Sequence, residues 1–499
     1  MHSSTGHVGR RGFLRSAALA PVAGSLEVLH AAAKPGAQPK NIIFMVADGM
    51  SPSVLPLADY FSKQVRGTGL LWRALMERPD ITHGLMDMAS LDSATTDSSA
   101  ASSSWGSGVR IFNSALNVLP DGTRLTPVAT IAREQGRRVG LVTTTTVTHA
   151  TPAGFAAVDP SRGNEEAIAE QYIKNVDVIL GGGVRFFDGS SRKDKRDLIS
   201  QYKQAGFTCV ASRAELQRCS QNGKMPAKML GLFTPGMLPF SLDRRNNASL
   251  RESVPALAEM TSAALDALRH SPKGFLLQVE GGRVDHAAHN NDAAALLWDQ
   301  LAFDEAIEVV LKFAGQNPET LIVITADHGN GNPAIGGKSA QFRGDSNGFR
   351  VLAGAQCSFE QLLARLNRAK GAPAAIQEAV REALGIELTK DELDAVAASV
   401  GGKKGLSLNS RLDKPVGILG EAVGNHTGIG WVSADHTSDY TLLTALGPGR
   451  ERFAGYVRNT KCFENMVDFM GSRFRNPTMA REAARAFPRP AVEIAPHWV

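Results

Sequence analysis

The segment Val279–Asn290 (VEGGRVDHAAHN) places three metal-ligand side chains within ten residues, directly after an apolar run. Asp285 and His289 are four residues apart, so one helical turn would bring them to the same face, where both can bind one ion. Glu280 lies five residues before Asp285, at the end of the apolar run, and could reach a different ion. The segment therefore indicates ligands for more than one metal.

A second apolar run, within Val323–Asn330 (VITADHGN), ends in the adjacent pair Asp327 and His328. Asp48 directly follows another apolar run, and His436 lies in a late Ala-Asp-His-Thr sequence. Carboxylate oxygen combined with imidazole suits Zn²⁺, whereas ligation by oxygen alone suits Mg²⁺. Apolar strands that deliver such residues to one edge predict a site with several metals.

A serine and an arginine could give such a site the groups needed for chemistry on phosphate. Ser98 follows Asp97 at the start of a small-residue helix, and helix N-termini favour phosphate groups. The chain has no G-x-S-x-G sequence, which argues against a serine hydrolase of the α/β-hydrolase type, so a metal would have to activate this hydroxyl. Arg162 could hold two phosphate oxygens in a fork, and Thr151 supplies a further hydroxyl near the sheet edge.

The scaffold that must position these residues alternates strands with helices. Near-continuous apolar strands in such an order predict an α/β fold with a large, mostly parallel sheet covered by helices on both faces. Active sites in these sheets lie beyond the carboxyl ends of the strands. The expected strands are Asn41–Ala47, Arg138–Thr143, Val176–Leu180, Phe275–Val279, Leu321–Ala326 and Tyr440–Leu446. The expected helices are Thr126–Gln135, Val254–Leu268 with Pro255 in its first turn, and Asp292–Phe313.

One region departs from this alternation. Within about 335–425, Ser358–Val400 is Ala-rich and predicted to be mainly helical, with apolar side chains at helical spacing. Thr389 and Glu392 can form a capping box for one of these helices, which GGKKG after Val400 would end. We interpret this region as a helical insertion on the catalytic domain, residues 34–499. The alternative is that it packs into the same core and has no separate identity.

The length and charge of the chain limit the classes of function that it can have. The chain has 499 residues and a formal charge of +5, and it has no dense basic run with interleaved aromatics, so nucleic-acid binding is not expected.

Four cysteines allow three disulfide connectivities, and Cys209 and Cys219 could close a local loop. No C-x-x-C pair exists, so a thiolate zinc site is not expected.

The N-terminal 33 residues have the features of an export signal. A basic segment with the pair Arg10-Arg11 precedes an apolar stretch, Ala17–Leu29, and then three alanines. The paired arginines before Phe13 resemble a twin-arginine signal, which predicts export to the periplasm or the extracellular space. No other stretch reaches about 18 apolar residues, so no membrane span is expected.

These motifs, taken together and in this order, resemble the alkaline phosphatase family. The resemblance covers nearly the whole chain after residue 33. It is carried by NIIFMVADGM, TDSSAAS, HATPAG followed by an arginine, DVILGGG, LGLF, PALAEMT, VEGGRVDHAAHN, VITADHGN and a late His-Thr.

The resemblance implies two zinc ions and a third metal ion, usually Mg²⁺. One zinc would be bound by Asp285, His289 and His436, although a second His-Thr, at His426, competes for the last place. The second zinc would be bound by Asp48, Asp327 and His328. The third ion would take Thr151 and Glu280, shared with Asp48. His149 would lie near the third ion, where imidazole favours zinc or cobalt, and His286 near the phosphate pocket.

The resemblance also implies the activity: hydrolysis of phosphate monoesters through a phosphoserine on Ser98, with Arg162 binding the phosphate. Homodimerisation is expected on the same ground. Two alternatives stay open from the residues. One is a phosphodiesterase or sulfatase of the same superfamily, although no C-x-P-x-R sulfatase sequence is present. The other is an exported protein that binds metal or phosphate without turnover.

Overall fold

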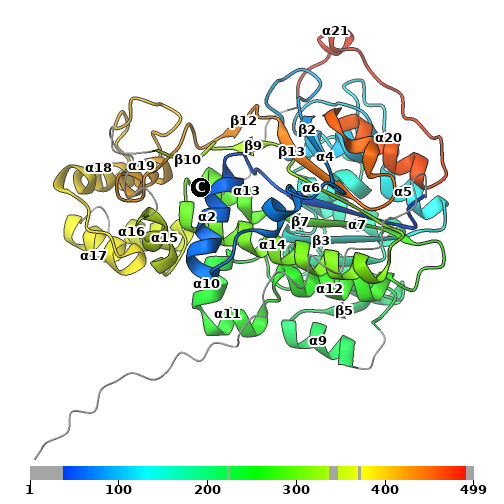
Figure 1. Ribbon diagram of the computed structural model, residues 1–499, viewed down its shortest axis with the longest axis horizontal. Helices are drawn as coiled ribbons and strands as arrows, with labels where there is room; N and C mark the ends of the chain where they lie inside the picture. Colours follow the sequence, from blue (N-terminus) through cyan, green and yellow to red (C-terminus); the bar gives the residue numbers. More distant parts are fainter. Residues whose placement is uncertain (1–37, 222–224, 337–346, 369–371, 491–499) are drawn as a thin grey trace, which may run out of the picture.

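A ten-stranded sheet forms the centre of the molecule in the computed structural model, which describes residues 38–221, 225–336, 347–368 and 372–490 (Figure 1). The strand order is β14-β2-β13-β8-β1-β7-β3-β4-β6-β5. Strand β13 pairs antiparallel with both neighbours, and the other pairs are parallel. The predicted mostly parallel sheet is confirmed. The strands are β1 (Asn41–Ala47), β2 (Thr82–Asp87), β3 (Arg138–Thr146), β4 (Val178–Gly182), β5 (Thr208–Val210), β6 (Met229–Leu232), β7 (Phe275–Gly281), β8 (Thr320–Thr325), β13 (Thr441–Leu446) and β14 (Gly455–Arg458).

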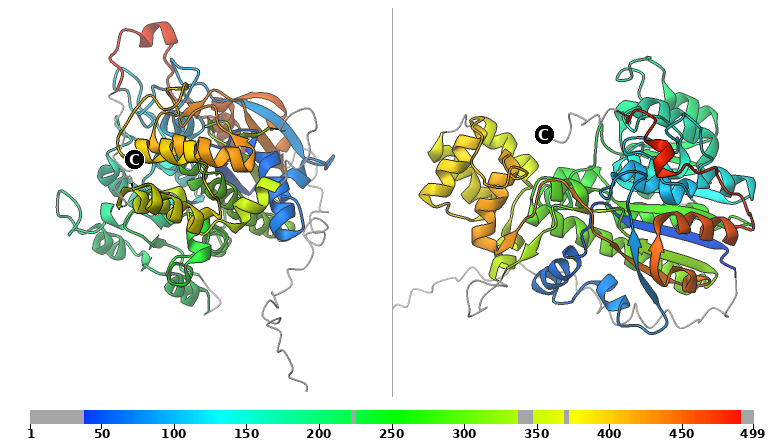
Figure 2. Two further views of the ribbon diagram at one scale, coloured as in Figure 1. Left: turned by 90° about the vertical axis from the view of Figure 1, so that its left-hand side faces the viewer. Right: turned by 90° about the horizontal axis from the view of Figure 1, so that it is seen from above.

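Both faces of the sheet are apolar because successive side chains of a strand point to opposite sides. In β1, Ile43 and Met45 belong to one buried cluster, and Ile42 and Phe44 to the other. Helices cover both faces, as the sequence predicts (Figure 2). The first cluster includes side chains of α2 (Val54–Arg66), α3 (Leu71–Leu75), α12 (Leu257–Leu268) and α14 (Ala293–Gln316). The second includes α4 (Ser98–Ser107), α5 (Val128–Glu134), α6 (Ala150–Ala156), α7 (Glu165–Asn175) and α20 (Asn459–Phe469).

Helix α12 begins later than the sequence suggests. The predicted helix starts at Val254, but α12 starts at Leu257. Val254 precedes Pro255 and is therefore held in an extended conformation, with φ −105° and ψ 124°. The N–H of Ala256 donates to the Glu259 carboxylate over 2.9 Å, which caps the helix at its actual start.

Five helices of the described residues between β8 and β13 lie to one side of the sheet in two perpendicular views (Figures 1 and 2). They are α15 (Asn347–Gly354), α16 (Phe359–Arg368), α17 (Pro373–Leu384), α18 (Lys390–Val400) and α19 (Pro415–Thr427). Their apolar side chains, among them Phe359 and Val380, nevertheless belong to the buried cluster that covers one face of the sheet. Thr389 and Glu392 form the expected capping box of α18.

The four cysteines are free, so no disulfide closes the predicted loop between Cys209 and Cys219. Cys209 lies in β5, whereas Cys219 lies in α9 (Arg213–Gln221) and packs against the first apolar cluster. None of the helices in the described ranges combines the length and the apolar character that crossing a membrane requires.

A buried aspartate in α14 gives the stability of the fold a pH dependence. Both Asp299 carboxylate oxygens accept from Ser241 at the start of α10 (Ser241–Asn246), and burial raises the Asp299 pKa from 3.8 to about 7. Because the pKa of Asp299 is higher in the folded than in the unfolded protein, the protonated side chain stabilises the fold. This stabilisation is complete below the unfolded pKa and is lost as the pH rises to about 7. The free energy of unfolding of Asp299→Asn should therefore rise relative to that of the wild type between pH 5 and pH 8.5, by about 3 kcal/mol at most.

Thermal melting of both proteins at the two pH values measures this difference. Asp266→Asn, which changes an exposed carboxylate in α12, is the matched control and should track the wild type at both pH values. An Asp299→Asn difference that stays constant with pH would contradict the burial argument.

Candidate active site

Three carboxylates meet because their strands are neighbours in the sheet. Val46 of β1 lies opposite Glu280 of β7 on one side and opposite Thr325 of β8 on the other. Asp48 and Asp327 follow the ends of β1 and β8 by a residue or two, so all three side chains emerge at one edge. Each of these three carboxylate residues is fully buried. The sheet therefore gathers, at its carboxyl edge, acidic residues from far-separated segments.

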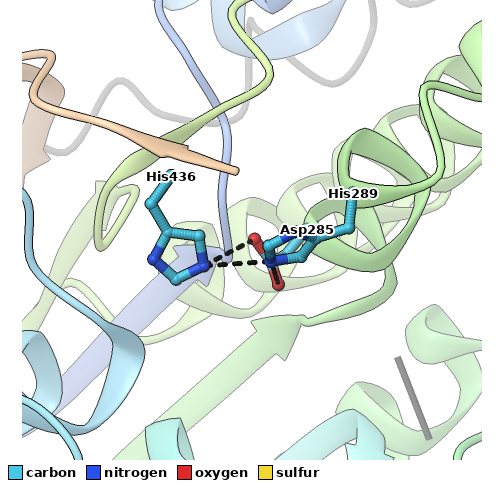
Figure 3. Close-up of side chains that lie close together, drawn as sticks. All are labelled: Asp285, His289 and His436. Carbon is cyan, nitrogen blue, oxygen red and sulfur yellow. Dashed lines mark hydrogen bonds and ion pairs between the residues drawn. The ribbon is translucent and has the colours of Figure 1, made fainter. Parts of the chain in front are cut away.

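The first group of potential metal ligands is Asp285, His289 and His436, whose ligand atoms lie within 4.8 Å of one another (Figure 3). Asp285 and His289 share one face of α13 (Arg283–His289), as their spacing predicts. The His289 Nδ1 lies 2.8 Å from the Ala434 carbonyl, and the His436 Nδ1 lies 2.9 Å from the Thr96 carbonyl. Since a carbonyl only accepts, each Nδ1 carries the hydrogen and each Nε2 keeps its lone pair for a metal.

A two-residue strand pair decides which late histidine joins this group. Strand β12 (His436–Thr437) pairs antiparallel with β9 (Gly329–Asn330), which directly follows His328. The rings of His436 and His328 stack with centroids 3.7 Å apart. The competing His426 lies at the end of α19, where its Nε2 is 3.0 Å from the Glu392 carboxylate of α18. Of the two candidates, only His436 is brought to Asp285 and His289.

The second group is Asp48, Asp327 and His328, all buried. The His328 Nε2 lies 3.2 Å from Asp327 and 3.6 Å from Asp48. Gly49 makes the turn after β1 with φ +68°, and its N–H donates to Asp327 over 2.9 Å. A Cβ at Gly49 would lie 2.3 Å from an Asp285 oxygen, so only glycine fits between the two groups.

The third group is Asp48, His149 and Glu280. The Thr151 hydroxyl donates to Asp48 over 3.3 Å, and the Thr143 hydroxyl donates to Glu280. Asp48 therefore belongs to both the second and the third group. The sequence places His149 only near the third metal, whereas the structure brings one of its ring nitrogens within ligand range of Asp48 and Glu280.

The protonation chemistry of these residues fits metal ions. Burial and neighbouring carboxylates raise the pKa of Asp48 well above its usual value and that of Asp327 to about 6, and burial raises the pKa of Glu280 to about 7. Asp285 has a lowered pKa, because the neighbouring histidines outweigh its burial. One oxygen of each of these four carboxylates accepts no hydrogen bond from the described residues. Buried acidic oxygens without donors are expected to bind cations.

The histidines complement this arrangement. Burial lowers the pKa of His328 to about 4 and that of His436 to about 3. The pKa of His149 is also lowered to about 3, by burial and then by Arg162. Neutral imidazoles at neutral pH have lone pairs available for metals. The donor set, buried carboxylates mixed with neutral imidazoles, therefore fits zinc at the first two groups.

Ser98 is the first residue of α4 and lies against the second group. Its hydroxyl is 3.2 Å from the His328 Nε2, and the residue is buried. Asp97 caps the helix by accepting from the Ala100 N–H over 2.9 Å. A hydroxyl at a helix N-terminus beside metal ligands is placed to attack an anion held there.

Arg162 lies beside the serine and is held from two sides. One guanidinium nitrogen donates to Asp97 over 3.1 Å, and the other lies 3.0 Å from the His149 Nε2. Asp97 is an addition to the predicted set: its pKa is lowered because Arg162 and hydrogen bonds outweigh the effect of burial. Its position as N-cap, directly before Ser98, was the sequence signal for this role.

His286 follows Asp285 in α13 and lies edge-on to His149, with ring centroids 5.7 Å apart. Its Nδ1 is 2.8 Å from the Arg283 guanidinium. Asn330 also contacts the first group of potential metal ligands, since its amide donates to Asp285 over 2.7 Å. No local pattern marks Arg283 or Asn330 as functional, because each acts through a tertiary contact. All twelve predicted site residues thus lie in one continuous cluster.

Comparisons with known proteins point the same way. The family model described as alkaline phosphatase matches residues 39–471. Alkaline phosphatase 3 of Bacillus subtilis (strain 168) is 30% identical over 445 residues, covering 86% of this chain and 88% of the relative. Alkaline phosphatase 4 of the same organism is 29% identical over 447 residues, covering 85% and 87%. The crystal structure of Thermus thermophilus alkaline phosphatase is similar, with a TM-score of 0.84 and 36% identity over 94% of this chain and 99% of the other.

Proposed function

Because this chain belongs to the alkaline phosphatase family and is a phosphoric monoester hydrolase, we propose that it acts through a phosphoserine on Ser98. The observation that carries this proposal is the contact between the Ser98 hydroxyl and His328, within a cluster in which Asp48 joins two metal-ligand groups. The site would hold two zinc ions and a third ion.

The donor sets support this division of metals. Asp285, His289 and His436 would hold one zinc, and Asp48, Asp327 and His328 the other. Asp48, Glu280 and Thr151 would hold the third ion, with His149 beside them; oxygen ligands suit Mg²⁺, and an imidazole ligand shifts the preference towards zinc or cobalt. When bound, these ions would lower the pKa of the serine hydroxyl and neutralise negative charge on phosphate and leaving group.

The residues of the chain define the rest of the reaction. Arg162, fixed by Asp97, binds two nonbridging phosphate oxygens and orients the ester. Ser98 Oγ attacks phosphorus, the bond to the alcohol oxygen breaks, and the alcohol leaves with a proton. Water then attacks the phosphoserine, which restores the Ser98 hydroxyl and releases inorganic phosphate. Positioning and charge stabilisation supply most of the rate enhancement in phosphoryl transfer.

We also propose where the enzyme acts, how its chain is divided and how it assembles. Residues 1–33, which would direct twin-arginine export to the periplasm or extracellular space, lie outside the described residues. Residues 34–499 would form the catalytic domain, with 335–425 as its helical insertion. A homodimer is proposed from the family membership.

The activity on mono- and diesters tests the proposed function against the related phosphodiesterase activity. Arg162 can pair with two oxygens of a dianionic monoester, whereas a diester has lost one of these charges. We expect p-nitrophenyl phosphate to react at least about a hundredfold faster than bis-p-nitrophenyl phosphate, because two charge-assisted hydrogen bonds are worth roughly 3 kcal/mol together. Comparable or inverted rates would assign the site to diesters instead.

A further inference from the structure

The segment of helices α15–α19 contacts the catalytic core at the start of α16. Two buried aspartates accept hydrogen bonds from Ser358 and Phe359, at the start of α16. Asp243 of α10 accepts from the Ser358 N–H over 2.8 Å and from its hydroxyl over 2.7 Å. Asp292, which caps α14, accepts from the Phe359 N–H over 2.6 Å. The first turn of α16 is therefore fixed relative to the catalytic core, and with it Glu360.

Glu360 holds Arg283, the first residue of α13. One guanidinium nitrogen of Arg283 donates to Glu360 over 2.6 Å, and the guanidinium stacks 3.6 Å from the Phe240 ring centroid. The Arg283 N–H donates to the Thr144 hydroxyl of β3 over 3.1 Å. The Arg283 side chain is only 6% exposed, whereas that of Glu360 is 52% exposed. Arg283 is thus a buried cation held in one orientation by residues from three elements.

The other guanidinium nitrogen of Arg283 decides the tautomer of His286. It lies 2.8 Å from the His286 Nδ1. A guanidinium has hydrogens to donate and no lone pair to accept with, so Nδ1 must be the unprotonated nitrogen. The ring hydrogen is then on Nε2, and a doubly protonated ring would set two N–H groups against each other. His286 in turn lies edge-on to His149, which contacts Arg162.

We propose that Arg283 is a positioning residue that holds His286 as the Nε2–H tautomer, a neutral hydrogen-bond donor for phosphate, and that Glu360 fixes Arg283 for this task. The inference rests on the proposed phosphate site beside Arg162. It gives the α15–α19 segment a role in the reaction: its α16 supplies the anchor for a residue that prepares the phosphate pocket.

Histidine ring nitrogen NMR on the metal-loaded, full-length protein tests the tautomer directly. In protein labelled with ¹⁵N-histidine, the His286 signals, identified by their loss in His286→Gln, should show an unprotonated Nδ1 and a protonated Nε2. Arg283→Met removes the donor and should give a mixture of tautomers. A protonated Nδ1 in the wild type overturns the role of Arg283, whatever the activity of the enzyme.

Inhibition by inorganic phosphate tests the functional consequence. Arg283→Met and His286→Gln should each raise the inhibition constant about tenfold, the value of one hydrogen bond, and the double variant should raise it no further. Arg283→Lys, which keeps one donor, should recover part of the loss. Effects that multiply in the double variant, or unchanged inhibition in Arg283→Met, overturn the proposal.

A milder variant covers the case in which Arg283→Met fails to fold. Glu360→Gln removes the charge at an exposed position and should raise the phosphate inhibition constant about threefold. Glu378→Gln, which breaks an exposed ion pair with Arg381 in α17 of the same segment, is the matched control and should change nothing. Equal behaviour of these two variants overturns the role of Glu360. Unchanged inhibition in His286→Gln likewise overturns the donor role of His286, whereas a wild-type enzyme that inorganic phosphate does not inhibit would overturn the proposed phosphate site itself.

Discussion

Ser98→Ala should form no phosphoenzyme and should lose at least about a thousandfold in kcat, as removal of a catalytic nucleophile does in other hydrolases. The Ser98 hydroxyl lies 3.2 Å from the His328 Nε2, whereas the hydroxyl of the neighbouring Ser99 donates to Asp97 over 2.6 Å. Rapid-quench labelling with a ³²P-phosphate ester, followed by acid precipitation, measures the covalent intermediate.

Ser104→Ala is the matched control for this result. Ser104 lies in the same helix, is equally buried, and donates only to the Ala100 carbonyl, over 2.9 Å. Its replacement should leave labelling and turnover close to the wild type. A labelled phosphoenzyme in Ser98→Ala would show that a different residue is the nucleophile.

Metal removal should have the second large effect, on both activity and stability. Four fully buried carboxylates share the site, and the nearby cation Arg162 is already paired with Asp97. Without metal ions the negative charges that remain on these carboxylates are uncompensated, which costs on the order of 3–5 kcal/mol and should lower the melting temperature by roughly 10 °C. Dialysis against a chelator should abolish hydrolysis, and added zinc should restore both properties.

The stability of Asp327→Asn with and without zinc distinguishes loss of metal binding from general destabilisation of the fold. The variant should be less stable than the wild type when zinc is present, because a ligand is lost. In the chelated protein at pH 8 it should be the more stable of the two, since it removes one buried charge. The Asp327 pKa is raised to about 6, so the cost of this charge grows as the pH rises through 6, and the advantage of the variant should shrink at pH 5. A variant that is less stable under all conditions would contradict this account.

Much of the site follows from local pattern. Apolar runs that end in Asp48, Glu280 and Asp327 predicted parallel strands with acidic residues at one edge, because a strand buried on both faces must be apolar along its length. The spacing of Asp285 and His289 predicted one helical face for the same kind of reason. The helix start at Leu257 is a local failure: the effect of Pro255 on the residue before it outweighed the apolar periodicity.

The tertiary structure decided what depends on contacts between distant segments. His436 and His426 have the same local sequence signal, and only the pairing of β12 with β9 brings His436 to Asp285 while α18 retains His426 at Glu392. The contact from Glu360 through Arg283 to His286 likewise joins α16 to α13. The sequence by itself determined which residue types stand at the ends of strands and on one face of a helix, because those arrangements repeat with the period of the backbone. Which of them share an ion, and which histidine is oriented by which arginine, was decided only when the sheet order and the packing of helices set the distances between them.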